Sequence, residues 1–379
     1  MTTTRLYHSL RSFYLFFPRH KKTTLSLVAI FILFLWVSPL LKYAPQGASI
    51  AKGFLFSEKN LRLHEDNVNI LVLGLGGPKN EPSGLTDTII FSSFNLKAED
   101  GKSSLLLSLP RDIWSPSLQA KINTAYYYGN RTDGLGMKWA ADTISEIVGQ
   151  PISYTVVVSF DGFVKIIDLL GGVDVLVERS FIDKNYPISG KEDDTCGGDR
   201  NLGCRYETLS FDEGQQHFDG KLALKFARSR NAEGLEGTDF ARAVRQQKVI
   251  VALKDKLFAP TFLLNPIKLD QMIKLIGQSL ETDIPESHLG GLARIALNAR
   301  GGDLRSEVLG AIGVEGATDG FLEHPPISRK YGNQWVLTPR VDSWQPLQGW
   351  VVCLLGGEIC PIGDFTKEIN DQYNRNEAI

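Results

Sequence analysis

The chain has 379 residues, of which 43% are hydrophobic, so it is long enough for one large or two ordinary domains with a sizeable core. Its formal net charge is -2 at pH 7. A general nucleic-acid-binding protein normally needs a basic face, so the charge balance argues against a nucleic-acid partner.

An uncharged stretch near the N-terminus predicts a membrane anchor. Residues 23–41 (TTLSLVAIFILFLWVSPLL) carry no formal charge over nineteen residues, enough to cross a bilayer core as a helix. The basic run RHKK at 19–22 precedes it, and the positive-inside rule then places residues 1–22 in the cytoplasm. We therefore expect a single-pass protein of the cell membrane, with residues 42–66 as a linker to an extracytoplasmic domain. A cleaved signal peptide and a buried core helix are the alternatives.

Four cysteines form two local sets that fit an exported protein. Cys196 and Cys204 bracket the loop CGGDRNLGC, and Cys353 and Cys360 bracket CLLGGEIC. Neither spacing is the C-x2-4-C of a zinc site, and no histidine lies close enough to complete one. Because disulfides persist outside the cytoplasm, the sequence predicts one disulfide within each set. Unpaired buried thiols are the alternative.

Three apolar runs at the start of the predicted domain indicate a strand meander. They span residues 69–75, 88–96 and 104–109. In an antiparallel meander the start of the second strand and the end of the third lie on the same rim of the sheet. Asp87 and Arg111 are therefore expected to converge there.

Strand and helix patterns alternate in the next part of the chain. Residues 137–148 have a helical pattern, 153–159 a strand pattern, 160–170 that of a short amphipathic helix, and 173–177 a strand pattern. This alternation predicts an α/β sandwich.

Two further helices are predicted over residues 219–227 and 239–258, each with an aspartate at its start. On the second helix, Asp239, Arg242 and Gln246 fall at i, i+3 and i+7 and so share a face.

Every basic residue between positions 228 and 245 is arginine. The planar guanidinium fork binds two phosphate oxygens at once, whereas lysine offers one mobile point charge. Arg228 and Arg230 are two positions apart, so they face the same way only if the chain becomes extended after Ala227. Arg245 is expected to point elsewhere. The segment is suited to binding phosphate groups.

The order and spacing of these motifs resemble the extracytoplasmic domain of the LytR-CpsA-Psr family, which attaches glycopolymers to the bacterial cell wall. The resemblance covers about half of the chain. It rests on TDT at 86–88, SLPRD at 108–112, KINTAY at 121–126, GGVDV at 171–175, RSR at 228–230 and DFARAVRQQ at 239–247. It implies an α/β/α sandwich with a central mixed β-sheet as a catalytic domain over residues 67–258. Residues 259–379 are then a C-terminal extension that packs on or follows the core, and nothing in it resembles chemistry.

The resemblance also implies roles for seven residues. Asp87 helps to hold a magnesium ion at a pyrophosphate, and Arg111 contacts the phosphate under attack. The head of a polyprenyl pyrophosphate is held by Arg228, Arg230 and Arg242, with Asp239 and Gln246 as polar partners of that cluster.

One position departs from the family pattern. Many members have an acidic residue just after the first strand, where this chain has Leu75-Gly76-Gly77. The number of protein ligands to a metal, and the need for magnesium itself, are therefore open. Asp87 and Asp112 are both candidates for a general base.

The predicted function is a phosphotransferase that moves a glycan from a polyprenyl pyrophosphate to peptidoglycan and forms a phosphodiester. An arginine cluster with a divalent cation stabilises the charge that develops on a pyrophosphate leaving group. A polyprenyl pyrophosphate hydrolase is one alternative. A non-catalytic membrane protein that carries the lipid is the other. The chain has neither GxGxxG nor GxSxG, so neither dinucleotide binding nor a serine hydrolase is indicated.

Overall fold

The computed structural model of the chain describes residues 61–76, 84–96, 104–299, 304–312 and 320–377. The predicted membrane anchor at residues 23–41 lies outside these ranges. Among the residues that are described, none of the helices combines the length and the apolar character needed to cross a membrane.

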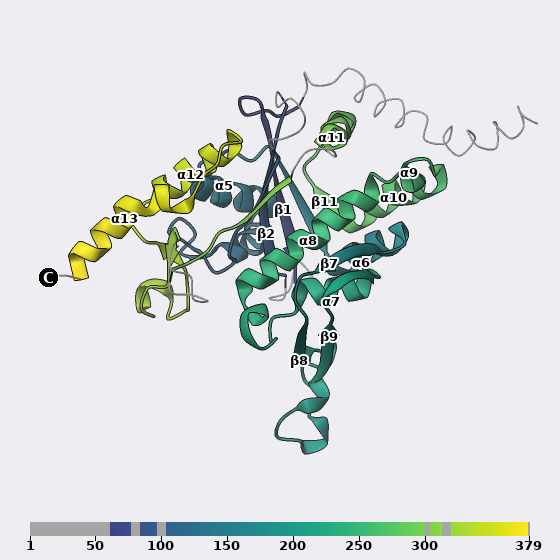
Figure 1. The fold of residues 1–379 in the computed structure, drawn as a ribbon, viewed down its shortest axis with the longest axis horizontal. Helices are drawn as coiled ribbons and strands as arrows, with labels where there is room; N and C mark the ends of the chain where they lie inside the picture. The colour runs from purple at the N-terminus through teal and green to yellow at the C-terminus, as the bar shows by residue number, and fades with distance from the viewer. Residues whose placement is uncertain (1–60, 77–83, 97–103, 300–303, 313–319, 378–379) are drawn as a thin grey trace, which may run out of the picture.

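A six-stranded mixed sheet forms the centre of the molecule (Figure 1). Its strands are β1 (Asn67–Leu75), β2 (Thr86–Asn95), β3 (Ser104–Ser108), β6 (Tyr154–Ser159), β11 (Leu280–Thr282) and β12 (Leu304–Val308). In space they follow the order β11-β6-β1-β2-β3-β12. β1, β2 and β3 form the antiparallel meander expected from the sequence, while β6 runs parallel to β1 and β12 runs parallel to β3.

Helices cover both faces of this sheet, which confirms an α/β fold with a central mixed sheet. The helices are α4 (Ala125–Thr132), α5 (Gly136–Val148), α6 (Phe160–Leu170), α7 (Gly220–Arg228), α8 (Asp239–Leu257), α9 (Pro260–Leu263), α10 (Pro266–Ser279), α11 (Glu286–Ala299), α12 (Gln345–Leu355) and α13 (Ile362–Glu377). Figure 1 shows α5 and α12 on one side of the sheet and α6, α7 and α8 on the other.

The period-2 pattern of β1 explains how the first side is held. Leu71, Leu73 and Leu75 point to one face, where they join a buried cluster with Ile144 of α5 and Trp350 of α12. All five side chains are almost completely buried. Removing this apolar area from water is the main stabilising contribution on this side.

The predicted helices agree with the structure except at their ends. Asp219 caps α7, as its carboxylate accepts a hydrogen bond from Leu222 N at 2.7 Å. α8 begins at Asp239, as predicted, and its cap is Thr238, whose hydroxyl accepts a hydrogen bond from Ala241 N at 3.0 Å. Asp239 is the first helical residue, and its carboxylate is left for another contact.

The smaller sheets lie outside the central one. Their strands are β4 (Trp114–Ser115), β5 (Ala120–Lys121), β7 (Val173–Val177), β8 (Phe181–Pro187), β9 (Tyr206–Phe211), β10 (Gly214–Phe218), β13 (Leu322–Glu323) and β14 (Thr338–Pro339). The β8–β9 hairpin projects from the body of the molecule (Figure 1). A disulfide between Cys196 and Cys204 closes the loop at its tip, and a second disulfide joins Cys353 to Cys360 after α12.

The C-terminal region belongs partly to the central sheet. β11 and β12 both lie beyond residue 258, where the sequence analysis ends the catalytic domain, yet they form the two edges of the sheet. Beyond β12 the strand contacts are short: Leu337 forms a parallel bridge with Ile113, and β14 pairs with β13.

A close approach between α6 and α7 gives a test of this packing. A methyl group at Gly220 would overlap the backbone carbonyl of Val164, whereas a methyl group at Gly277 on α10 meets nothing within 4 Å. We expect Gly220→Ala to lower the free energy of unfolding by about 1–3 kcal/mol through overpacking. Gly277→Ala should leave it unchanged or raise it by about 0.5–1 kcal/mol. Urea unfolding of the full-length chain measures both, and equal midpoints for the two variants would contradict the packing.

Candidate functional site

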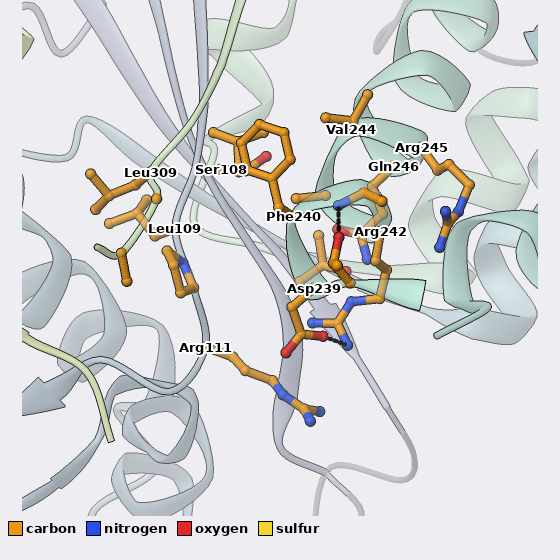
Figure 2. A pocket seen from close by; sticks show the side chains of 18 of the residues that line it. Ser108, Leu109, Arg111, Asp239, Phe240, Arg242, Val244, Arg245, Gln246 and Leu309 are labelled. Atoms are coloured by element: carbon orange, nitrogen blue, oxygen red, sulfur yellow. Dashed lines mark hydrogen bonds and ion pairs between the residues drawn. The ribbon is translucent and has the colours of Figure 1, made fainter. Parts of the chain in front are cut away.

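A pocket of about 640 Å³ lies between α8 and the β3–β12 edge of the central sheet. One end is charged, and its lining includes Asp87, Arg111, Asp112, Asp239, Arg242 and Gln246. The other end is apolar, lined by Leu109, Phe240, Val244, Val308 and Leu309. Figure 2 shows both ends, with Arg111, Asp239 and Arg242 at one and Leu109, Leu309, Phe240 and Val244 at the other. The pocket is therefore amphiphilic.

Arg111 and Asp87 meet at the rim of the sheet, as the meander predicts. The Arg111 guanidinium forms an ion pair with Asp87, and its Nε lies 3.5 Å from Asp112 Oδ2. Burial lowers the pKa of Arg111, but the charges of Asp87 and Asp112 outweigh that effect and raise it. Arg111 therefore stays positively charged although its side chain is partly buried.

Lys121 is a charged neighbour to which the sequence analysis assigned no role. Its Nζ lies 2.5 Å from Asp112 Oδ1. Asp112 therefore has a cation on each side, and its side chain is only 14% exposed. Lys121 is the first residue of the KINTAY motif, and its place in that motif could have predicted a role at this site.

Arg242 extends the charged end along α8. It forms an ion pair with Asp239, one turn earlier, at 2.8 Å, and its side chain is only 11% exposed. Burial lowers the pKa of Arg242, and the positive charges of Arg111 and Arg230 lower it further. The charges of Arg111 and Arg230 therefore both act on Arg242.

Neither Arg228 nor Arg230 lines the pocket. α7 continues through Arg228, one residue further than predicted, and its guanidinium lies over the ring of Phe160 at 4.2 Å. Arg230 follows in an exposed turn, where its charge acts on Arg242. The chain becomes extended only at Ser229, so the two arginines point to different neighbours.

A buried carboxylate fixes the loop that carries Arg230. Asp183 Oδ2 accepts hydrogen bonds from the Ser229 hydroxyl at 2.7 Å and from the backbone N–H groups of Arg230 and Asn231 at 3.3 Å. Asp183 is completely buried. Because it turns three donors of the loop inward, the Arg230 side chain is left facing outward.

Arg245 has a structural role, and it does not join the Arg111–Arg242 group (Figure 2). Its side chain is 3% exposed and donates to Phe226 O at 3.1 Å and to Glu236 Oε2 at 2.9 Å. Gln246 donates to Ala227 O at 3.4 Å. Both side chains connect α8 to the end of α7 and the following loop.

Metal-binding capacity at the pocket is limited to carboxylates. In the described ranges, the only cluster of three or more His, Cys, Asp or Glu ligands with metal-binding geometry is Asp194 with Cys196 and Cys204, and both cysteines are in a disulfide. At the pocket, the Asp87 carboxylate is 32% exposed and can reach a ligand. A cation there must take most of its ligands from substrate oxygens and water.

The chain thus forms a mixed α/β domain with a pocket that is lined by both charged and apolar side chains. The model of the LytR_cpsA_psr family matches residues 43–309. The chain belongs to this family, and the resemblance found in its sequence is confirmed.

Two curated relatives are 27% and 28% identical to the chain over the aligned residues. A polyisoprenyl-teichoic acid–peptidoglycan teichoic acid transferase TagU of Halalkalibacterium halodurans is 27% identical over 242 residues, covering 62% of this chain and 66% of the relative. The TagV transferase of the same description from Bacillus subtilis is 28% identical over 207 residues, covering 53% of this chain and 45% of the relative. The chain thus spans about half to two thirds of the length of these relatives.

Solved structures share the fold. The crystal structure of Bacillus subtilis TagV superposes with a TM-score of 0.52 at 24% identity, covering 78% of this chain and 99% of TagV. The protein gbs0355 of Streptococcus agalactiae gives a TM-score of 0.54 at 19% identity, over 78% of this chain and 90% of that protein.

The loop anchored by Asp183 gives a second test. Asp183→Asn keeps the shape of the side chain but replaces a charged acceptor of three hydrogen bonds with an amide that must turn one N–H group toward donors. We expect a loss of about 1–3 kcal/mol in the free energy of unfolding. Asp193→Asn, at an exposed position of the hairpin tip, is the matched control and should be neutral. Equal urea midpoints for the two variants would show that the carboxylate does not hold the loop.

Proposed function

We propose that the protein is a phosphotransferase that moves a glycopolymer from a polyprenyl pyrophosphate to peptidoglycan. The observation that carries this proposal is the amphiphilic pocket. Its charged end suits a pyrophosphate, and its apolar end, between α8 and the sheet, suits the first units of a prenyl chain.

The partly buried guanidiniums of the pocket support an anionic ligand. Arg242 is almost buried, and burial is the largest cause that lowers its pKa. Asp239 has the largest charge effect and favours the guanidinium charge, while Arg111 and Arg230 disfavour it. A pyrophosphate would add negative charge beside Arg242, and arginine forks bind its oxygens in pairs.

The names of the relatives support the proposed substrate classes. Two of them are named polyisoprenyl-teichoic acid–peptidoglycan teichoic acid transferases. A structure described as TagT bound to LIIa-WTA has a similar fold, with a TM-score of 0.50 at 21% identity over 77% of this chain and 92% of that chain. We extend to this chain a polyprenyl-linked glycan as donor and peptidoglycan as acceptor. The predicted anchor at residues 23–41 would hold the domain on the outer side of the cell membrane, beside its lipid substrate.

The reaction exchanges a phosphoanhydride bond for a phosphoester bond. A hydroxyl oxygen of peptidoglycan attacks the phosphorus that carries the glycan, and the bond from this phosphorus to the bridging oxygen breaks. The products are a glycan–peptidoglycan phosphodiester and a polyprenyl phosphate, which takes the negative charge. The hydroxyl proton passes to a base.

We assign the chain's residues to these events as follows. Arg111 stabilises the developing charge on the phosphorus under attack, while Arg242 and Arg230 hold the leaving phosphate, with Asp239 and Gln246 orienting that group. Asp87 is the more exposed of the two candidate bases, because Asp112 is held by Lys121. Arg228, over the Phe160 ring, is placed to contribute less to the head group than Arg230.

Magnesium fits the donor set at Asp87. Mg²⁺ is commonly bound by one or two carboxylates with substrate phosphates and water, so the missing acidic residue at Leu75-Gly76-Gly77 does not exclude it. Bound there, the ion would neutralise charge on the phosphate oxygens.

Separate measurements of turnover and binding test the assignment. We expect Arg111→Ala to lower turnover about 100- to 1000-fold, because it removes a donor to the transition state, and to weaken lipid binding much less. Arg230→Ala should instead weaken lipid binding directly, and Arg228→Ala, its matched control, should weaken it less. The assays are transfer of a labelled lipid-linked glycan to peptidoglycan and lipid binding by the same full-length variants.

The same assays separate the alternatives. Asp87→Asn should lower turnover and remove any stimulation by magnesium. Release of glycan phosphate to water without transfer would indicate the hydrolase. Lipid binding by the wild type with neither transfer nor hydrolysis would indicate the carrier, and the transferase proposal would fail.

A further inference from the structure

Trp335 is an exposed aromatic residue on the rim of the pocket. Its side chain is 38% exposed and lines the same pocket as Arg111 and Asp87. Although no chemistry was expected in the C-terminal region, Val308, Leu309 and Trp335 of that region line the pocket. Trp335 also lies beyond residue 309, where the match to the family model ends.

The Trp335 ring is held in place by its neighbours. The imidazole of His324 stacks on it, with ring centroids 4.9 Å apart and planes at 27°. Val336 O can only accept, so His324 Nδ1 donates to it, at 2.9 Å, which fixes the imidazole beside the indole. An exposed tryptophan supported on a fixed ring is a preformed flat surface.

Backbone hydrogen bonds connect this surface to the charged end of the pocket. Leu337 N donates to Asp112 O at 2.9 Å, and Trp114 N donates to Leu337 O at 2.8 Å. The segment that carries Trp335 therefore pairs with the segment that carries Arg111 and Asp112. The indole is positioned beside the phosphate site rather than at the prenyl end.

A pyranose ring matches this surface. The indole face is electron-rich, and one face of a pyranose presents C–H groups that are apolar and slightly positive, so the two stack favourably. Asn333 and Gln334 are exposed next to Trp335, and their amides can donate to and accept from sugar hydroxyls. A prenyl chain would need no such polar neighbours.

We propose that Trp335, supported by His324, is a sugar-binding platform that holds a pyranose ring next to the reacting phosphate. The ring belongs either to the donor glycan or to the peptidoglycan acceptor, since both would be covalently close to the reacting phosphorus. This proposal rests on the proposed function and adds a sugar subsite to it.

Three ligands and the full-length protein test the platform. The first is farnesyl pyrophosphate, which has no sugar; the second is a short polyprenyl pyrophosphate that carries N-acetylglucosamine; the third is soluble uncrosslinked peptidoglycan strands, added with farnesyl pyrophosphate bound. Trp335→Ala should weaken binding of the second or the third ligand about 3- to 10-fold, as expected for loss of an aromatic stack. Binding of farnesyl pyrophosphate should change less than twofold. Trp335→Phe should retain most of the sugar-dependent affinity.

The outcomes distinguish the sources of the sugar and the two proposals. A loss with the second ligand only assigns the donor, and a loss with the third only assigns the acceptor. Tyr128→Ala removes another exposed aromatic side chain away from the pocket and should change neither. Equal weakening of all three ligands by Trp335→Ala, or no weakening of either sugar ligand, would overturn the platform. Failure of the wild type to bind farnesyl pyrophosphate would instead count against the proposed function.

Discussion

The ion pairs that hold Arg111 and Arg242 beside the pocket are the interactions on which the rest of the site depends. A guanidinium that is largely shielded from water is tolerated only if opposite charges or hydrogen bonds compensate its charge. Asp87, Asp112 and Asp239 provide that compensation from a strand end, a loop and the first turn of a helix. In the proposed function, the phosphates of the ligand share these guanidiniums with the carboxylates.

Contacts within the fold hold these charges in place. Asp183 orders the loop of Arg230 through Ser229, and Arg245 connects the same loop to α8 by donating to Ser229 O. Thr238 caps α8, which leaves the Asp239 carboxylate for Arg242. The placement of the arginines is therefore a property of the surrounding framework as much as of the arginines themselves.

Sequence reasoning found the parts of the site that depend on local geometry. Asp87 and Arg111 could be brought together because an antiparallel meander fixes which strand ends meet, and Asp239 and Arg242 because helical spacing puts them on one face. The features that depend on contacts between residues far apart in the sequence were not predicted. Arg228 contacts the ring of Phe160, a residue far from it in the sequence, and the spacing of the RSR motif could not predict that contact. The same holds for β11, β12 and Trp335, whose partners lie far away in the sequence.

Identification of the lipid that accompanies the protein tests the central claim most directly. Full-length protein would be purified from membranes beside an Arg111→Ala/Arg242→Ala variant, and the lipids bound to each would be identified by mass spectrometry. The account predicts a polyprenyl phosphate or pyrophosphate on the wild type and its loss from the folded variant. Wild-type protein without such a lipid, or equal retention by the variant, would contradict the assignment of the pocket.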